Sequence, residues 1–187
     1  MPKSPQNYLD PRQPLVVDTT KLPRQPGATR ALRRVVAAPA DLGLELIAVP
    51  EGSDLELDLT LTSVSEGVYV TGRIRGSLAG ECARCLGVID DSFDVPLAEL
   101  FAYEDSTTEE TTDDDEVGRM QGDLIDLEPV VRDAVVLALP ANPVCQPDCP
   151  GLCPECGVHL DDLPADHRHE AVDPRWAALR NLSNNKE

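Results

Sequence analysis

Six cysteines, gathered in two places, restrict most strongly how this chain of 187 residues can fold. The stretch VCQPDCPGLCPECGVHL, residues 144–160, contains Cys145, Cys149, Cys153 and Cys156, and the earlier stretch ECARC contains Cys82 and Cys85. Two residues between paired cysteines allow both sulfurs to reach one metal ion from a tight turn. Gly157 follows the last pair and permits a backbone conformation that most residues avoid. The spacing predicts metal binding, with zinc as the expected ion.

The compartment expected for the chain supports metal over disulfides. The N-terminal sequence MPKSPQNYLDPRQP lacks the charged start and apolar core of a signal peptide, and no apolar run approaches the ~18 residues of a membrane helix. We therefore expect a cytoplasmic protein, in which reducing systems keep disulfides open. A redox function for Cys153 and Cys156 is the alternative. A redox pair of this kind would require a following helix in a βαβ unit, and the sequence pattern contains no such unit.

Strand patterns dominate the middle of the chain. Residues 54–62, DLELDLTLT, alternate strictly between leucine and polar residues, the period of a half-buried strand. Residues 65–67 supply a turn, and the alternation from Val68 to Leu78 predicts the second strand of an antiparallel hairpin. A third strand is expected through Phe93, Val95 and Leu97, with Phe101 and Tyr103 beyond it. Cys82 and Cys85 would then lie at the tip of a hairpin between the second and third strands.

The pattern changes on both sides of this sheet. Prolines are frequent in residues 1–30, which predicts an extended, basic arm over residues 1–34. An apolar stripe over residues 128–139, with Pro129 in the first turn and Pro140 after the last, predicts a helix that covers the sheet. Asp173 and Pro174 predict the start of a short C-terminal helix. We thus expect an α+β fold in which an antiparallel sheet domain, residues 35–140, precedes a zinc-binding module, residues 141–187.

Counting ligands leads to two metal sites. A closed structural zinc site takes four ligands, and His167 and His169 in HLDDLPADHRHE would complete two sets of four. The preferred partition assigns Cys82, Cys85, Cys145 and Cys149 to one zinc ion and assigns Cys153, Cys156, His167 and His169 to the other. In the main rival arrangement, the four cysteines between residues 145 and 156 form one compact site and the hairpin pair is free. The two histidines could also be solvated surface residues, as is expected for His159.

Charge is unevenly distributed along the chain, whose formal net charge is −18. Residues 1–34 carry seven basic and two acidic side chains, whereas residues 81–128 carry two basic and sixteen acidic ones. Many of the acidic residues fall in an acidic loop, EDSTTEETTDDDE, at residues 104–116. A solvated loop explains this run, since like charges extend a chain and keep it soluble. Alternatively, the acidic surface attracts a basic protein partner or repels wrongly placed nucleic acid.

Several of these motifs together resemble one protein family. The combination of LPRQPGATR at residues 22–30, ECARCL at residues 81–86, the acidic region, LALPANPVC and CPGLCPECG is similar to the bacterial YceD family, also called the large ribosomal RNA subunit accumulation protein family. The resemblance covers nearly the whole chain. Many similar proteins end the zinc module with a Cys-x-Cys pair where this chain has His167-Arg168-His169. Because neutral imidazole can replace a thiolate on zinc, this departure supports the two histidines as ligands.

The resemblance implies a cytoplasmic, non-catalytic ribosome biogenesis factor that supports large-subunit (23S) rRNA accumulation or processing. Eight ligands for two zinc ions leave no open coordination position for catalysis, and the sequence has no HExxH or serine-nucleophile motif. We therefore expect no enzymatic activity, no catalytic residue and no cofactor other than zinc. A zinc-dependent adaptor in transcription or signalling is the alternative.

The partner class follows from charge. A chain of net charge −18 is repelled by a polyanion unless its basic groups gather in one place, and aromatic side chains that could stack on bases are few. Some basic residues do gather in the N-terminal arm, such as Lys21, Arg24, Arg30, Arg33 and Arg34. Ordinary charge scatter explains these equally well. We expect a basic ribosomal protein or a large-subunit precursor as partner, with direct rRNA contact not favoured.

Overall fold

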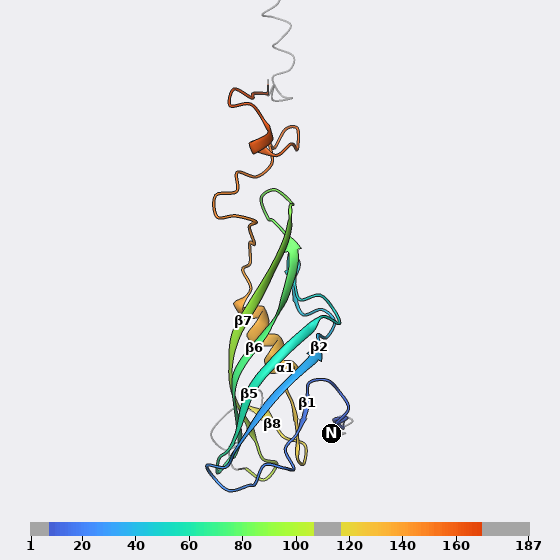
Figure 1. Cartoon of the computed structure of the whole chain (residues 1–187), viewed down its shortest axis with the longest axis vertical. Helices are drawn as coiled ribbons and strands as arrows, with labels where there is room; N and C mark the ends of the chain where they lie inside the picture. The colour runs from blue at the N-terminus through green and yellow to red at the C-terminus, as the bar shows by residue number, and fades with distance from the viewer. Residues whose placement is uncertain (1–7, 107–116, 170–187) are drawn as a thin grey trace, which may run out of the picture.

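The computed structural model describes residues 8–106 and 117–169 as strands around one α-helix (Figure 1). The longer elements are β2 (Thr29–Ala37), β5 (Asp54–Ser63), β6 (Gly67–Glu81), β7 (Val88–Ala102) and the helix α1 (Glu128–Ala138). The shorter elements are β1 (Val16–Asp18), β3 (Gly43–Leu44), β4 (Ile47–Ala48), β8 (Gly118–Arg119), β9 (Leu124–Asp126) and the 3-10 helix η2 (Leu160–Asp162). The mainly antiparallel sheet with a helix confirms that part of the expected fold class.

The main sheet is built on the order β2-β5-β6-β7 with antiparallel pairing throughout these four strands. Along β5 the side chains alternate between exposed and buried, and Leu55, Leu57, Leu59 and Leu61 are at most 2% exposed. The expected hairpin of β5 and β6 closes where the Val64 N–H donates to the Gly67 carbonyl oxygen at 2.9 Å. β8 adds the one parallel pairing, to β7, among the described strands.

The hairpin of β6 and β7 is longer than the strands beside it. β5 pairs with β6 as far as Arg75, opposite Glu56, whereas β6 and β7 stay paired to the end of the ladder, where Glu81 lies opposite Val88. The small strands β4 and β3 extend the other edge of β6 near this end. The turn at residues 82–87 is consequently carried away from the body of the sheet toward the C-terminal segment (Figure 1).

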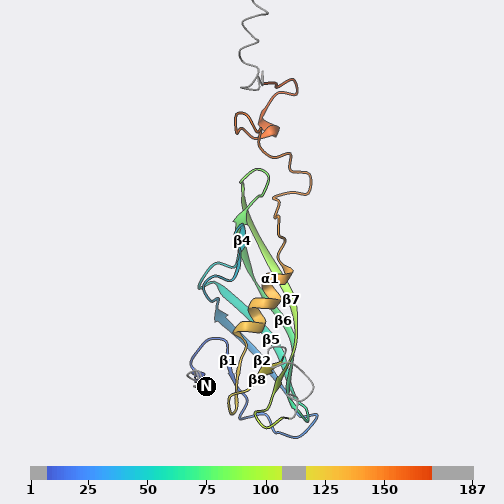
Figure 2. The same cartoon turned by 180° about the vertical axis from the view of Figure 1, so that it is seen from behind.

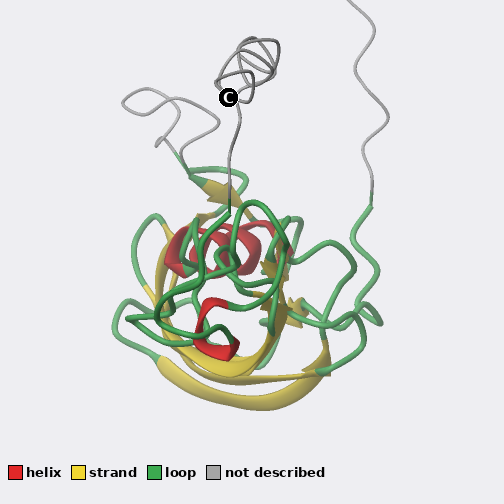
Figure 3. Ribbon diagram, turned by 90° about the horizontal axis from the view of Figure 1, so that it is seen from above, coloured by secondary structure: helices red, strands yellow, loops and turns green. Residues whose placement is uncertain are grey.

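The helix α1 lies against the inner face of the curved sheet (Figures 2 and 3). It begins where the Asp126 carboxylate accepts the Glu128 N–H at 2.9 Å, and Pro129 occupies the first turn, where a missing N–H costs nothing. Val131 and Val135 are fully buried and pack into the aliphatic core between helix and sheet. Leu137, on the opposite face of α1, is 85% exposed.

The N-terminal segment is more structured than an extended arm. β1 pairs with β9, and β2 forms a full ladder with β5. Arg30 and Arg34 of β2 donate hydrogen bonds to the carbonyl oxygens of Asp18 and Val16, which ties β1 beside β2. The prolines of this region lie before residue 29, so none of them interrupts the β2 ladder.

Some sequence expectations concern residues outside the described ranges. The expected C-terminal helix after Asp173 lies there, as do residues 107–116 of the acidic loop. Within the described ranges, no helix combines the length and the apolar character needed to cross a membrane.

Candidate metal centre

Two groups of four side chains bring potential metal ligands together. Cys82, Cys85, Cys145 and Cys149 form the first cluster, and Cys153, Cys156, His167 and His169 form the second. In each cluster the ligand atoms lie within 4.8 Å of one another. The structure thus groups the eight residues in two sets of four, and the compact arrangement of the four cysteines between residues 145 and 156 is not the one found.

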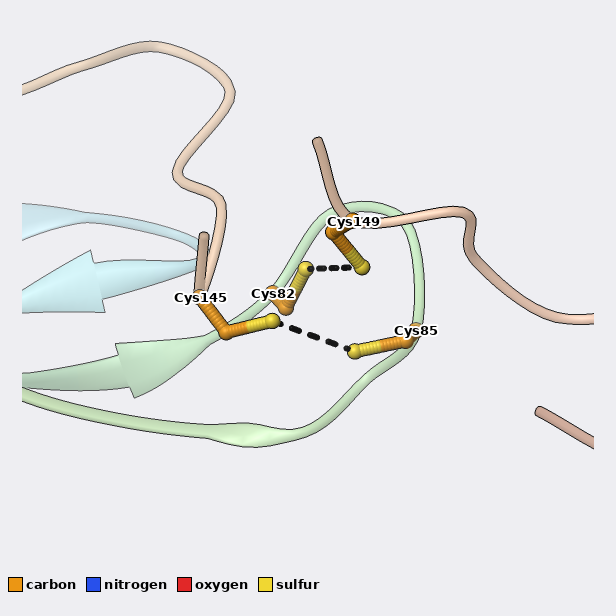
Figure 4. Close-up of side chains that lie close together, drawn as sticks. All are labelled: Cys82, Cys85, Cys145 and Cys149. Carbon is orange, nitrogen blue, oxygen red and sulfur yellow. Dashed lines mark hydrogen bonds between the residues drawn. The ribbon is translucent and has the colours of Figure 1, made fainter. Parts of the chain in front are cut away.

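The first cluster joins the hairpin tip to the segment that follows α1 (Figure 4). The sulfur atoms of Cys82 and Cys149 are 3.8 Å apart, and those of Cys85 and Cys145 are 3.7 Å apart. Disulfide-bonded sulfurs would be about 2.05 Å apart. Four sulfurs around a tetrahedral zinc ion, with bonds of about 2.3 Å, lie about 3.8 Å from one another. The spacing therefore fits zinc coordination and not disulfides.

Backbone hydrogen bonds hold the two segments of the first cluster together. The Ala83 N–H donates to the Pro143 carbonyl oxygen at 2.8 Å, and the Leu152 N–H donates to the Arg84 carbonyl oxygen at 3.2 Å. The Arg84 guanidinium donates to the Cys149 carbonyl oxygen at 2.9 Å. Gly151 packs so closely that an added Cβ would stand 3.0 Å from the Arg84 carbonyl oxygen. The sequence carried no signal for this role of Arg84, because a lone arginine in a turn is most often solvated.

The thiols of the first cluster differ in acidity. Burial raises the pKa of the Cys82 thiol, but backbone N–H groups, from Cys145 first and then Arg84 and Cys85, outweigh it and bring the pKa to about 6. The Cys145 sulfur points toward the cluster (Figure 4), and desolvation followed by hydrogen bonds with Cys149 and Cys85 raises its pKa to about 12. Burial likewise raises the pKa of Cys149. Four thiolates at this spacing repel one another, so a divalent cation would be needed to ionise all four.

The second cluster lies in the last part of the described chain. The Cys153 sulfur is 3.2 Å from His169 Nε2, and the Cys156 sulfur is 3.7 Å from His167 Nε2. The two imidazole rings meet edge to face, with their Nε2 atoms 2.7 Å apart. Backbone N–H groups of Cys156 and Glu155 lower the pKa of the Cys153 thiol to about 6 against the effect of burial. Two sulfurs and two imidazole nitrogens are a ligand set that zinc takes, and the Nε2 atoms would move apart to the spacing of about 3.3 Å in tetrahedral coordination.

His159 stands apart from both clusters. Its Nδ1 accepts the Asp161 N–H at 3.3 Å at the start of η2, and its side chain is 28% exposed. The ring therefore caps a turn, and it is more buried than the surface position expected for it.

The two clusters also differ in exposure. In the first cluster, Cys82 and Cys149 are 0% and 1% exposed, Cys85 is half-buried and Cys145 is exposed. In the second cluster, Cys153 is 5% exposed and His167 is half-buried, whereas Cys156 and His169 are both exposed. A metal ion in the first cluster would be enclosed by protein on the hairpin side. An ion in the second cluster would stand nearer to solvent.

Comparison with known proteins places the clusters in a family context. A family model described as "Large ribosomal RNA subunit accumulation protein YceD" matches residues 70–183, a range that includes both clusters. An uncharacterized protein of Mycobacterium tuberculosis is 56% identical over 166 residues, which are 89% of this chain and 80% of the relative. An uncharacterized protein of Mycobacterium leprae is 44% identical over 169 residues, 90% of this chain and 77% of the relative. The uncharacterized protein YlbN of Bacillus subtilis is 28% identical over 110 residues, 58% of this chain and 62% of YlbN. No solved structure matches this chain significantly.

Proposed function

Because the chain belongs to the YceD family, we propose that it is a non-catalytic ribosome biogenesis factor that supports large-subunit (23S) rRNA accumulation. The observation that carries the proposal is the family match over residues 70–183, whose name refers to that RNA. In this proposal the chain acts in the cytoplasm, and each of its two clusters holds a structural zinc ion.

Zinc in the first cluster would fix the C-terminal segment to the sheet. That segment is rich in loops and contributes few buried apolar side chains, among them Cys149 and Cys153. Such a segment gains little from burial to offset the entropy lost on ordering. Binding of a structural metal ion supplies that free energy directly. Four protein ligands in each cluster would leave no coordination position for a substrate, which supports a binding function over catalysis.

The positions of the arginines favour a protein partner over direct rRNA binding. Arg33 pairs with Asp58, and Arg73 and Arg75 both pair with Asp94 on the outer face of the sheet. Arg24 pairs with Asp123 and lies over the Tyr103 ring, while Arg30 and Arg34 bond backbone carbonyl groups of the N-terminal segment. An arginine beside a carboxylate adds little net positive charge to the surface, which weakens the attraction of that surface for phosphates. We therefore propose docking on a basic ribosomal protein or on a large-subunit precursor particle.

The test is affinity purification of the tagged chain from its own cells, followed by gradient sedimentation. We expect precursors of the large subunit to copurify, and we expect depletion of the protein to lower 23S rRNA relative to 16S rRNA. Wild-type protein should restore the ratio, whereas a Cys82→Ser variant should not. Recovery of RNA polymerase without ribosomal particles would instead indicate the transcription adaptor.

A further inference from the structure

The two Cys-x-x-Cys turns have the same backbone hydrogen bonds. In the first turn, the Leu86 N–H donates to the Cys82 carbonyl oxygen at 2.9 Å, and the Cys82 N–H donates to the Gly87 carbonyl oxygen at 2.8 Å. The second turn repeats this pattern. There the Gly157 N–H donates to the Cys153 carbonyl oxygen and the Cys153 N–H donates to the Val158 carbonyl oxygen, both at 2.8 Å. Leu86 and Gly157 therefore occupy equivalent positions.

The equivalent position requires a left-handed backbone. Its φ angle is 70° at Gly157 and 59° at Leu86. Glycine adopts this conformation freely, whereas a leucine there is disfavoured because its Cβ crowds the backbone. Leu86 and Asp41 are the non-glycine residues with positive φ in the described ranges. A leucine at this position needs a reason that the turn itself does not supply.

Burial does not provide that reason. Leu86 is 60% exposed, and Val88, at the start of β7, is 84% exposed. A side chain that strains the backbone and also remains largely in water stabilises neither the turn nor the core. Neither residue has ligand chemistry, so metal binding does not explain them. Both exposed side chains lie at the end of the hairpin of β6 and β7. That end extends beyond the body of the sheet (Figure 1).

Acidic side chains lie beside Val88 on the hairpin and are frequent along the neighbouring tail. Glu81 lies directly opposite Val88 in the ladder, and Asp90 follows Val88 on the same face of β7. The neighbouring tail adds exposed carboxylates and also the apolar side chains of Val158 and Leu160, which are 42% and 38% exposed. Acidic residues of the hairpin end and the tail outnumber the basic Arg84 and Arg168; they are Glu81, Asp90, Asp91, Asp148, Glu155, Asp161, Asp162 and Asp166.

We propose that Leu86 and Val88 form the apolar centre of a docking surface for a basic protein segment that carries its own apolar side chains. This inference rests on the proposed function and assigns its partner-binding site to the hairpin tip. The acidic surroundings complement lysine and arginine side chains, and the two aliphatic side chains supply area to be buried on binding. The same surroundings repel RNA, and aliphatic side chains offer no ring on which bases can stack.

The equivalence of the two turns provides a variant that keeps the fold. Leu86→Gly gives the first turn the residue that the second turn already has, so the backbone and the ligand positions should be preserved. Val88→Thr keeps a β-branched side chain on the strand and replaces one methyl group with a hydroxyl group, which reduces the apolar surface. Matched controls are Leu137→Ala, at an 85% exposed leucine on α1, and Val35→Thr, at a 59% exposed valine on β2.

The experiment measures binding of the zinc-loaded full chain to individually purified basic proteins of the large subunit, at about 0.15 M salt. We expect the wild-type chain to bind at least one of them and the Leu86→Gly, Val88→Thr double variant to bind about tenfold or more weakly. The double variant should retain the wild-type metal content in native mass spectrometry. The two control variants should bind as the wild type does.

Two results would overturn the inference, and they are distinguishable. If the double variant bound the same ribosomal protein with unchanged affinity, the hairpin tip would not be the docking surface, while the proposed function would stand. If the wild-type chain bound purified 23S rRNA tightly and none of the proteins, the protein partner of the proposed function would fail together with this surface.

Discussion

The sulfur atoms of Cys82 and Cys149 lie 3.8 Å apart although 67 positions separate the two residues in the chain. Cys82 follows β6 directly, and Cys149 belongs to the segment after α1. Half of the ligands in the first cluster thus come from the sheet and half from the tail. A metal ion bound there closes a long loop, which makes the position of the tail depend on the metal.

Replacing Cys82 by serine tests this dependence. We expect Cys82→Ser to lose one zinc ion per chain and to loosen the tail from the hairpin tip, because only three ligands would remain in the first cluster. Hydrogen exchange should show faster exchange at the amides of Ala83 and Leu152, which join the two segments. Cys156→Ser is the matched control, since it removes a ligand from the second cluster. Unchanged protection in Cys82→Ser would contradict the clamp.

The ligand assignment of the second cluster is tested through its histidines. Native mass spectrometry should find two zinc ions per wild-type chain and one in a His167→Ala, His169→Ala variant. His159→Ala should retain both ions, because the His159 ring accepts a backbone N–H in its own turn and lies outside the cluster. One zinc ion in all three proteins would show that the histidines are not ligands.

The sequence patterns predicted strand β5 and helix α1. The leucine alternation of residues 54–62 lies within β5, and the apolar stripe of residues 128–139 contains α1. Both elements bury one face at a fixed period, so local sequence is enough to identify them. Cys-x-x-Cys spacing likewise pointed to two of the candidate ligands in each cluster, because two sulfurs that are close in sequence converge wherever the turn lies.

Other features depend on contacts that no local pattern reveals. β2 buries Leu32 and Val36 and exposes the residues between them, so its sequence TRALRRVVA does not alternate as β5 does. β2 is nevertheless a strand because it pairs along its whole length with β5. β7 extends from Val88 through several exposed residues because the β6 ladder continues beside it. The strained backbone at Leu86 is likewise a property of the folded turn, because its φ of 59° is visible only in the structure.

Metal affinity of the first cluster should fall as the pH is lowered. The raised pKa values of Cys145, to about 12, and of Cys149 leave both thiols protonated at neutral pH, and each must release its proton to bind zinc. Protons therefore compete with the metal ion, and because at least two protons are released the apparent association constant should drop by at least about a hundredfold per pH unit between pH 8 and pH 7. Competition with a chromogenic chelator in the His167→Ala, His169→Ala variant would measure this cluster alone. An affinity independent of pH would contradict thiolate ligation.

The stability of the sheet should depend on its leucines and not on the exposed leucine of the helix. Leu59 is 1% exposed in β5, where it lies opposite Leu32 of β2 and Gly72 of β6. Leu59→Ala would leave a cavity that these neighbours fill only in part, so we expect the free energy of unfolding to fall by about 2–5 kcal/mol. Leu137→Ala removes the same atoms from a side chain that is 85% exposed and should change the free energy by less than about 0.5 kcal/mol. Urea denaturation followed by circular dichroism, with saturating zinc in both samples, measures the difference. Equal losses in the two variants would show that the aliphatic face of β5 is not the centre of the core.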